Sequence, residues 1–224
     1  MDGITNLLPS VTCDQWQSTI VETDYRARVD AYLRDTRLQP LLLLGDAQIV
    51  LEQFPQASID MVMTSPPYWG KREYEDGGIG MEDDYRDYIC YFTWICCLIK
   101  RALKPEGSFW LNLGDTYHHI RLLGILWRVA LELTDYHGWI LRNSVIWNKV
   151  KSGMDTSKNR LGNVHEYVFH FVKQPKYYYN VDAIRSKPRQ SRVVNGSVIS
   201  ATGVSGVRYR RQIERSTALS DEEK

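Results

Sequence analysis

The chain has 224 residues, 43% of them apolar and 12% aromatic, and its formal net charge at pH 7 is +1. This length suffices for one ordinary domain with a sizeable core and a short appendage. A net charge so close to zero does not by itself indicate nucleic-acid binding. Whether the chain has a basic surface for nucleic acid depends on how its charges are distributed.

Cysteine spacing and the lengths of the apolar runs disfavour a zinc protein, a secreted protein and a membrane protein. The four cysteines, Cys13, Cys90, Cys96 and Cys97, form no CxxC pair, which disfavours a zinc site and favours free thiols in a reducing compartment. The N-terminus has no basic segment followed by an apolar one, and no apolar run approaches the roughly 20 residues of a membrane span. We therefore expect a cytoplasmic protein without a metal and without a membrane segment.

Helical and strand patterns alternate along most of the chain. In order, they predict a helix at 22–37, a buried strand at 40–46, a short helix at 47–55, a buried strand at 59–64, a helix at 84–104, a strand at 108–115, a helix at 119–136, strands at 139–149 and 166–173, and a loop or edge segment at 177–185. This alternation is typical of an α/β fold with a mostly parallel sheet and helices on both faces. Ligands of such sheets bind at the carboxyl ends of the strands, where Asp46, Ser65 and Asp115 are predicted to lie.

Three regions differ in pattern. Residues 1–38 are predicted to be an N-terminal helical extension, 39–185 the main α/β part, and 186–224 an irregular, basic segment. Basic side chains are concentrated in two segments, where they can track phosphates; the candidates are Lys149, Lys151, Lys158, Arg160, Arg185, Lys187, Arg189, Arg192, Arg208, Arg210 and Arg211. The alternative is a solvated basic tail.

The segment 64-TSPPYWG-70 follows an apolar run directly. Two consecutive prolines have no N–H to donate, so they end the strand and form a rigid turn. The exocyclic amine of a nucleobase is a poor nucleophile because its lone pair is delocalised into the ring. A serine hydroxyl and the next carbonyl can accept its two N–H bonds, and an aromatic ring can stack on the base, which must then leave its helix. Taken alone, the segment is equally consistent with an ordinary turn.

The sequence around this turn resembles the DNA amino-methyltransferases, the N4-cytosine and N6-adenine enzymes that use S-adenosylmethionine. The resemblance rests on SPPY, which is the form usual among N4-cytosine enzymes, and on 44-LGDAQIVLEQFPQASIDMVMTSPPYWGKREY-74, 79-IGMEDDYRDY-88, 101-RALKPEGSFWLNLGDTY-117 and 165-HEYVFHFVK-173. It spans about residues 41–185. It implies a Rossmann-like methyltransferase sheet, double-stranded DNA as the substrate, base flipping and a role in restriction–modification.

The same resemblance assigns roles to individual residues. Ser65 and the carbonyl of Pro66 would accept from the target amine, Pro67 would set the turn, and Tyr68 would stack on the flipped base, with Trp69 beside it. Asp115 would shape the base pocket and Asp46 would lie near the cofactor or base; alternatively, each caps a helix. We interpret four further polar residues as loop or structural positions: His118, His119, His165 and Glu166.

One expected element is missing. Members of this family with the SPPY segment first carry a later strand and an FxGxG turn that holds the methionine part of the cofactor, and 203-GVSGVRY-209 is a poor match to it. The 186–224 segment would then be the start of a target-recognition region. We therefore expect a sheet without its cofactor-binding strands, in a chain that is truncated or that pairs with a second polypeptide carrying the cofactor half.

The functional prediction is transfer of a methyl group from S-adenosylmethionine to N4 of cytosine in DNA, by this chain or by an enzyme of which it is one half. Two alternatives stay open. The target amine can be N6 of adenine, because serine at the first SPPY position favours cytosine without excluding adenine. The chain can also be a non-catalytic DNA-binding remnant or subunit, which the missing cofactor motif favours.

Overall fold

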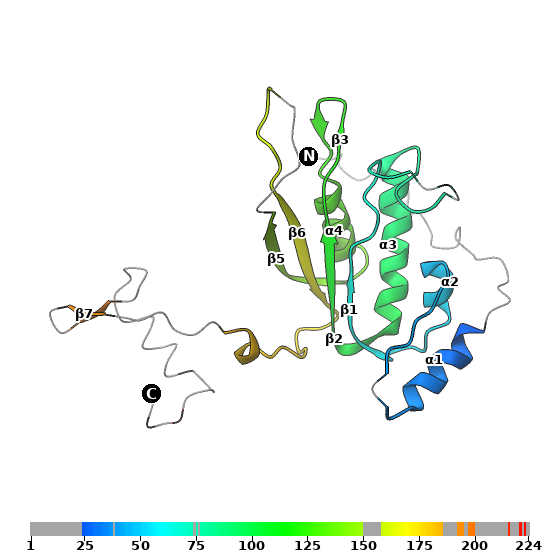
Figure 1. Cartoon of the computed structure of the whole chain (residues 1–224), viewed down its shortest axis with the longest axis horizontal. Coiled ribbons are helices and arrows are strands. Elements are labelled where there is room, and N and C mark those ends of the chain that lie inside the picture. Colours follow the sequence, from blue (N-terminus) through cyan, green and yellow to red (C-terminus); the bar gives the residue numbers. More distant parts are fainter. Residues whose placement is uncertain are drawn as a thin grey trace, which may run out of the picture. The chain divides into compact units, whose positions relative to one another are not determined.

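The computed structural model describes residues 24–37, 39–73, 75, 77–149 and 158–185, the backbone of 192–194 and 197–199, and the single positions 215, 220 and 222 (Figure 1). By its internal contacts the chain forms two units, Met1–Tyr178 and Tyr179–Lys224. In the second unit, the structure describes a short 3-10 helix η2 (Asp182–Ile184) and a hairpin of β7 (Arg192–Val194) and β8 (Ser197–Ile199). The candidate site lies in the first unit.

A four-stranded sheet forms the centre of the first unit. Its strands are β1 (Ile59–Thr64), β2 (Leu103–Leu113), β6 (His165–Val172) and β5 (Ile140–Asn148), in the spatial order β1-β2-β6-β5. β1 and β2 are parallel, whereas β6 is antiparallel to both β2 and β5. Three of the four strands therefore run in one direction, and β1 is an edge strand of the described sheet.

Two long helices cover one face of this sheet. α3 (Tyr85–Ala102) and α4 (Ile125–Asp135) contribute Phe92, Ile95, Val129 and Leu133 to a core that also contains the alternate residues Phe109, Leu111 and Leu113 of β2 and Phe169 and Phe171 of β6. In Figure 1 both helices are seen alongside the strands. α3 begins where the sequence predicts, with the Asp84 carboxylate accepting from the Arg86 N–H, and Lys100 and Arg101 lie in its last turn.

The opposite face carries no helix among the described residues. Met61, Met63 and Trp147 alternate with the core-facing residues of β1 and β5 and are 57%, 64% and 52% exposed. The expectation of helices on both faces is therefore not met in the part of the chain that the structure describes. The strand 59–64 is confirmed, but its predicted burial holds for one face only, because the helices that pack on the sheet come from its other side.

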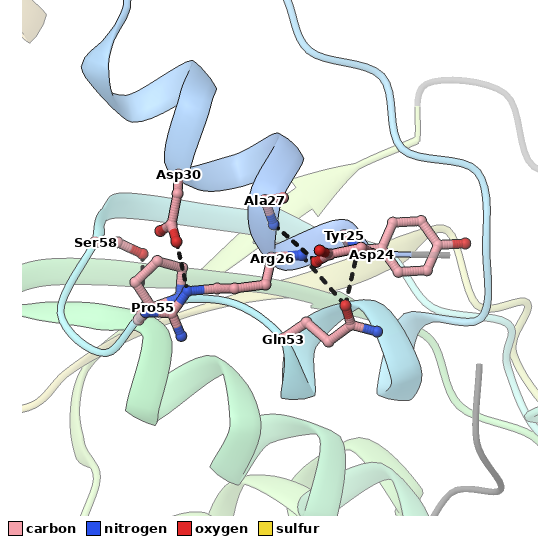
Figure 2. Close-up of polar contacts among 8 residues, drawn as sticks. All are labelled: Asp24, Tyr25, Arg26, Ala27, Asp30, Gln53, Pro55 and Ser58. Carbon is pink, nitrogen blue, oxygen red and sulfur yellow. Dashed lines mark hydrogen bonds and ion pairs between the residues drawn. The ribbon is translucent and has the colours of Figure 1, made fainter. Parts of the chain in front are cut away.

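α1 (Tyr25–Arg34) and α2 (Ala47–Glu52) form a small pair tied together by polar contacts (Figure 2). The side-chain oxygen of Gln53 accepts from the backbone N–H groups of Tyr25, at 2.9 Å, and Arg26, at 3.2 Å, and Asp24 caps α1 by accepting from Ala27 N. These contacts satisfy N–H groups at the start of α1 that have no partner within the helix. They fix the predicted helix at 22–37 against the residue that follows α2.

Two sequence predictions are wrong in the structure. Residues 40–46 form no strand, and Leu42 and Leu44 are 83% and 93% exposed, because the short apolar run lies outside the described sheet. The predicted helix at 119–136 begins only at Ile125, and its first residues belong to a hairpin of β3 (Tyr117–His118) and β4 (Arg121–Leu122). The apolar pattern alone cannot separate these outcomes. The run 41-LLLL-44 has the composition of a buried strand, and the apolar residues of 119–124 continue the period of the helix that follows.

Within the described residues no helix is long and apolar enough to cross a membrane, and no cluster of three metal-ligating side chains occurs. Cys90, Cys96 and Cys97 form no disulfide among the described residues, and burial raises the pKa of Cys96 well above its ordinary value. Cys96 is accordingly a packing residue of α3.

Candidate active site

The SPPY turn leaves the sheet at the carboxyl end of β1. The last residue of β1, Thr64, is paired with Leu111 of the parallel strand β2, so Ser65 lies at the level of Asn112. The Ser65 side chain is exposed, and its Oγ lies 3.1 Å from Oδ1 of Asn112. The predicted amine acceptor is therefore accessible and is held by a partner 47 positions later in the sequence.

Asn112 connects the two predicted functional side chains of the turn. Its Oδ1 accepts from Ser65 Oγ and from Tyr68 OH, both at 3.1 Å, and its Nδ2 donates to the carbonyl of Tyr167 on β6 at 3.1 Å. The bond to Tyr167 fixes which end of the amide faces the turn. Asn112 is only 5% exposed, and sequence reasoning missed it. The available signal was a single amide in the otherwise apolar stretch 109-FWLNL-113.

Donation of the Ser65 proton to Asn112 sets the polarity of the serine. A hydroxyl has one proton and two lone pairs, so a serine that donates to Asn112 turns lone pairs toward other partners. Tyr68 is held in the same way, since its OH also donates to Oδ1. An amide, unlike a carboxylate, does not take up a proton near neutral pH. The trio can thus present an acceptor but cannot act as a general base through Asn112.

The Tyr68 ring packs closely on the start of the loop after β2. A Cβ at Gly114 would lie 2.6 Å from Cε2 of Tyr68, so only glycine fits beneath the ring. Burial raises the pKa of the Tyr68 hydroxyl, the hydrogen bond with Ser65 opposes this, and the negative charge of Glu166 raises the pKa further. Tyr68 consequently stays protonated at neutral pH and remains a donor to Asn112.

The rest of the turn is held by backbone contacts. The carbonyl of Pro67 accepts from the Tyr88 hydroxyl of α3 at 3.0 Å, and Gly70 N donates to Gly80 O at 2.9 Å. Gly80 has a φ of +96°, and a Cβ there would lie 3.2 Å from the carbonyl of Tyr68. Gly70 and Gly80 therefore close tightly against each other and against the SPPY turn.

Trp69 is fixed within the same scaffold. Its indole N–H donates to Glu82 O at 2.8 Å, and its carbonyl accepts from Thr116 Oγ1 at 2.8 Å. The rings of Tyr85 and His118 lie 6.1 and 6.0 Å away, centroid to centroid. Trp69 thus joins the SPPY turn to α3 and to the loop after β2, next to the predicted base pocket.

The two aspartates of the Gly-Asp segments cap helices. Asp115 accepts from the backbone N–H groups of Thr116, Gly124 and Ile125 at 2.9, 3.0 and 3.1 Å. Asp46 accepts from the N–H groups at the start of α2. This is the geometry of the alternative interpretation, in which each carboxylate satisfies the start of a helix. A role of either side chain in the pocket remains a prediction.

The basic candidates lie in different surroundings. Lys149 forms an ion pair with Glu166, Arg185 pairs with Asp182 at 3.1 Å, and the Arg160 guanidinium lies 4.0 Å from the centre of the Tyr117 ring. Lys158 is exposed. Only the backbone of Arg192 is described. The remaining candidates lie outside the described residues: Lys151, Lys187, Arg189, Arg208, Arg210 and Arg211.

The described residues do not supply a cradle for S-adenosylmethionine. The strand-to-helix crossovers within them are long, running from 65 to 84 between β1 and α3 and from 114 to 124 between β2 and α4. Neither is the short glycine-rich turn that lets a nucleotide-like ligand approach a helix N-terminus in Rossmann-like sheets. The described residues therefore include the predicted base-contacting side chains but no such glycine-rich turn.

Comparison with known proteins agrees with the resemblance. The sequence profile of the N6/N4 DNA methylase family matches residues 59–198, more than half of the chain. The chain is 33% identical over 174 residues to type II methyltransferase M.SmaI of Serratia marcescens, covering 64% of this chain and 59% of that protein. It is 34% identical over 188 residues to type II methyltransferase M.XycI of Xanthomonas campestris pv. cyanopsidis, covering 68% and 62%.

A solved structure supports the same assignment. PvuII DNA methyltransferase (cytosine-N4-specific) matches with 26% identity and a TM-score of 0.54, over 63% of this chain and 51% of that chain. The α/β fold of the described unit is thus that of a DNA methyltransferase. The chain spans about 60% of the length of the two curated relatives named above.

Proposed function

The chain belongs to the N6/N4 DNA methylase family, and we propose on this basis that it provides the base-binding half of a site-specific DNA methyltransferase acting on N4 of cytosine. The observation that carries the proposal is the trio Ser65, Tyr68 and Asn112, in which an exposed hydroxyl at the end of β1 is oriented by a buried amide. PvuII DNA methyltransferase, with a similar fold, is named as cytosine-N4-specific.

The trio suits an exocyclic amine as its ligand. The two N–H bonds of such an amine need two acceptors close together, and the Ser65 hydroxyl with the adjacent Pro66 carbonyl provides them at the end of a strand. Because proline restricts the residue before it to extended conformations, the Ser65 backbone is fixed by sequence. The Tyr68 ring, held by Asn112 and Gly114, offers a rigid surface for stacking of the base.

A flipped base in double-stranded DNA is the substrate that fits this arrangement. A pocket at the edge of a sheet is out of reach of a base in its stack, so the nucleotide must be extruded. Lys158 and Arg160, near the same edge of the sheet, are candidates to contact the phosphate backbone. Lys149 is a weaker candidate because its charge is paired with Glu166.

We propose that the methyl donor is S-adenosylmethionine and that residues outside the described sheet complete its site. β1 is an edge strand of the described sheet, and Met61 and Met63, on the face of β1 that no described helix covers, are both more than half exposed. An open edge of this kind is a place where further strands can pair. The cofactor half would come from a second polypeptide or from further residues of the same protein.

The target amine is tested by methylating DNA and digesting it to nucleosides. The purified chain is incubated with double-stranded DNA and labelled S-adenosylmethionine, with and without a partner that supplies the cofactor half. We expect N4-methylcytosine as the labelled nucleoside, whereas N6-methyladenine would assign the alternative target. Ser65→Ala should remove most of the rate, and Ser58→Ala, whose hydroxyl bonds to Pro55 O away from the site, should not.

A non-catalytic role is the second candidate, and the absence of a cofactor cradle among the described residues favours it. Calorimetric titration of S-adenosylmethionine into the folded chain distinguishes the two. Saturable binding would place the cofactor site on this chain. Absence of binding, together with DNA affinity that Ser65→Ala leaves unchanged, would identify a DNA-binding subunit without catalytic activity of its own.

A further inference from the structure

The β3–β4 hairpin is anchored beside the SPPY turn. Its two ends are joined by the hydrogen bond from Leu123 N to Thr116 O at 3.1 Å, and Thr116 Oγ1 donates to the carbonyl of Trp69 at 2.8 Å. Asp115, immediately before it, holds the start of α4. The hairpin therefore has a fixed base at the carboxyl edge of the sheet, where Figure 1 shows it projecting beyond the strands.

The tip of this hairpin is tight and presents an apolar side chain to solvent. His119 and Ile120 are the two residues between the paired positions His118 and Arg121. His119 has a φ of +53°, a conformation that tight hairpin turns usually give to glycine or asparagine. The side chain of Ile120 is 92% exposed, and its branched Cβ leaves it few rotamers.

A second apolar tip lies close to the hairpin, next to a cation. Arg160 stacks over the ring of Tyr117, at 4.0 Å from its centre, and Leu161, the next residue, is 91% exposed. Residues 117–122 and 158–164 contain Arg121, Lys158 and Arg160 and no acidic residue. The edge of the sheet thus combines projecting aliphatic side chains with positive charge.

This combination fits the duplex from which a base is extruded. A single exposed isoleucine is ordinary on a protein surface and would carry no argument. Here the isoleucine stands on a tight turn beside the predicted base pocket, and Arg121 follows it directly in the hairpin. Proteins that kink DNA insert apolar side chains of this type between bases while arginine and lysine contact the phosphates. A protein partner would not need the excess of positive charge.

We propose that Ile120 is a wedge that enters the base stack at the position left by the flipped nucleotide, with Arg121 and Arg160 contacting the flanking phosphates. The inference rests on the proposed function, because it takes double-stranded DNA as the ligand of this edge. It assigns to the β3–β4 hairpin the task of holding the duplex open while the base lies against the SPPY turn. No chemical step is involved.

The test compares two fluorescent duplexes of about 25 base pairs that differ by one central abasic position. An abasic position already provides the gap, so a wedge binds it without the cost of unstacking, and we expect the full chain to prefer it by about tenfold at equal salt. Ile120→Ala should abolish the preference and leave affinity for the intact duplex within about twofold. Arg160→Gln should weaken binding to both duplexes equally.

Leu131→Ala is the matched control, because Leu131 is also an exposed aliphatic residue but lies on α4. It should keep the full preference, and circular dichroism confirms that each variant is folded. Binding to the intact duplex without preference for the abasic one, or a preference that survives Ile120→Ala, would overturn the wedge and leave the proposed function standing. Failure to bind either duplex would overturn both.

Discussion

Replacing Asn112 by leucine tests the central contact of the candidate site. Leucine has a similar size and shape but neither accepts from Ser65 and Tyr68 nor donates to Tyr167. Three hydrogen bonds of 3.1 Å are lost, each worth about 0.5–1.5 kcal/mol net. We therefore expect the free energy of unfolding to fall by about 2–4 kcal/mol.

The network makes a sharper prediction for double variants. In a double-mutant cycle with Tyr68→Phe, the pair should be coupled by about 1 kcal/mol, since the Tyr68 hydroxyl is partly buried. Coupling with Ser65→Ala should be smaller, about 0.5 kcal/mol, because Ser65 is exposed and water can replace its partner. The assay is urea unfolding followed by circular dichroism at a fixed pH and temperature.

Asp30→Ala provides the control cycle, because Asp30 pairs with Arg26 on the surface of α1 and shares no partner with Asn112. Its combination with Asn112→Leu should be additive within about 0.3–0.5 kcal/mol. If Asn112→Leu and Tyr68→Phe are equally additive, the two side chains do not share a hydrogen bond in solution. The orientation of Ser65 by Asn112 would then be wrong as well.

Three further predictions concern the scaffold of the site. Gly114→Ala places a Cβ against the Tyr68 ring and should destabilise the protein by about 1–3 kcal/mol in urea unfolding; Tyr68→Ala in the same chain should recover part of this loss, and no recovery would mean that the clash lies elsewhere. Asp115→Ala should lower the free energy of unfolding by about 1–2 kcal/mol because the start of α4 loses its cap, and Asp115→Asn should lower it less. Burial raises the pKa of Tyr88 above the ordinary 10.0, so the unfolded chain loses this proton first and stability should fall as the pH rises above about 10. Tyr88→Phe should flatten that fall in urea titrations at several pH values, and an unchanged slope would contradict the burial of the hydroxyl.

Local signals in the sequence were sufficient for much of the fold. The helix of residues 85–102 follows from its apolar period, its Asp84 cap and the cations in its last turn, all of which act within a few positions. The strand of residues 59–64 ends where two prolines remove consecutive donors. The SPPY turn could be predicted for the same reason, because the strand, the two prolines and the aromatic residues follow one another directly in the sequence.

Local signals failed where the outcome depends on distant partners. The leucines of residues 40–44 have the composition of a buried strand, yet burial needs a neighbouring strand, and none of the described strands pairs with them. Residues 119–122 of the β3–β4 hairpin fall within the helix predicted at 119–136, because their apolar residues continue the helical period. For Asp115 the sequence left two roles open, because a carboxylate after a strand can line a pocket or cap a helix. In the structure it accepts from N–H groups at the start of α4.

The family resemblance, the α/β alternation and the position of the SPPY turn could all be predicted from the sequence, because short contiguous segments carry them. The folded structure was needed to see that Asn112 holds Ser65 and Tyr68, that Gly114 lies beneath the Tyr68 ring, and that Ile120 projects from an anchored hairpin. The physical reason is register. Ser65 and Asn112 meet because β1 and β2 pair in parallel with Thr64 opposite Leu111, and such a pairing is set by the packing of whole strands on the helices rather than by either segment alone.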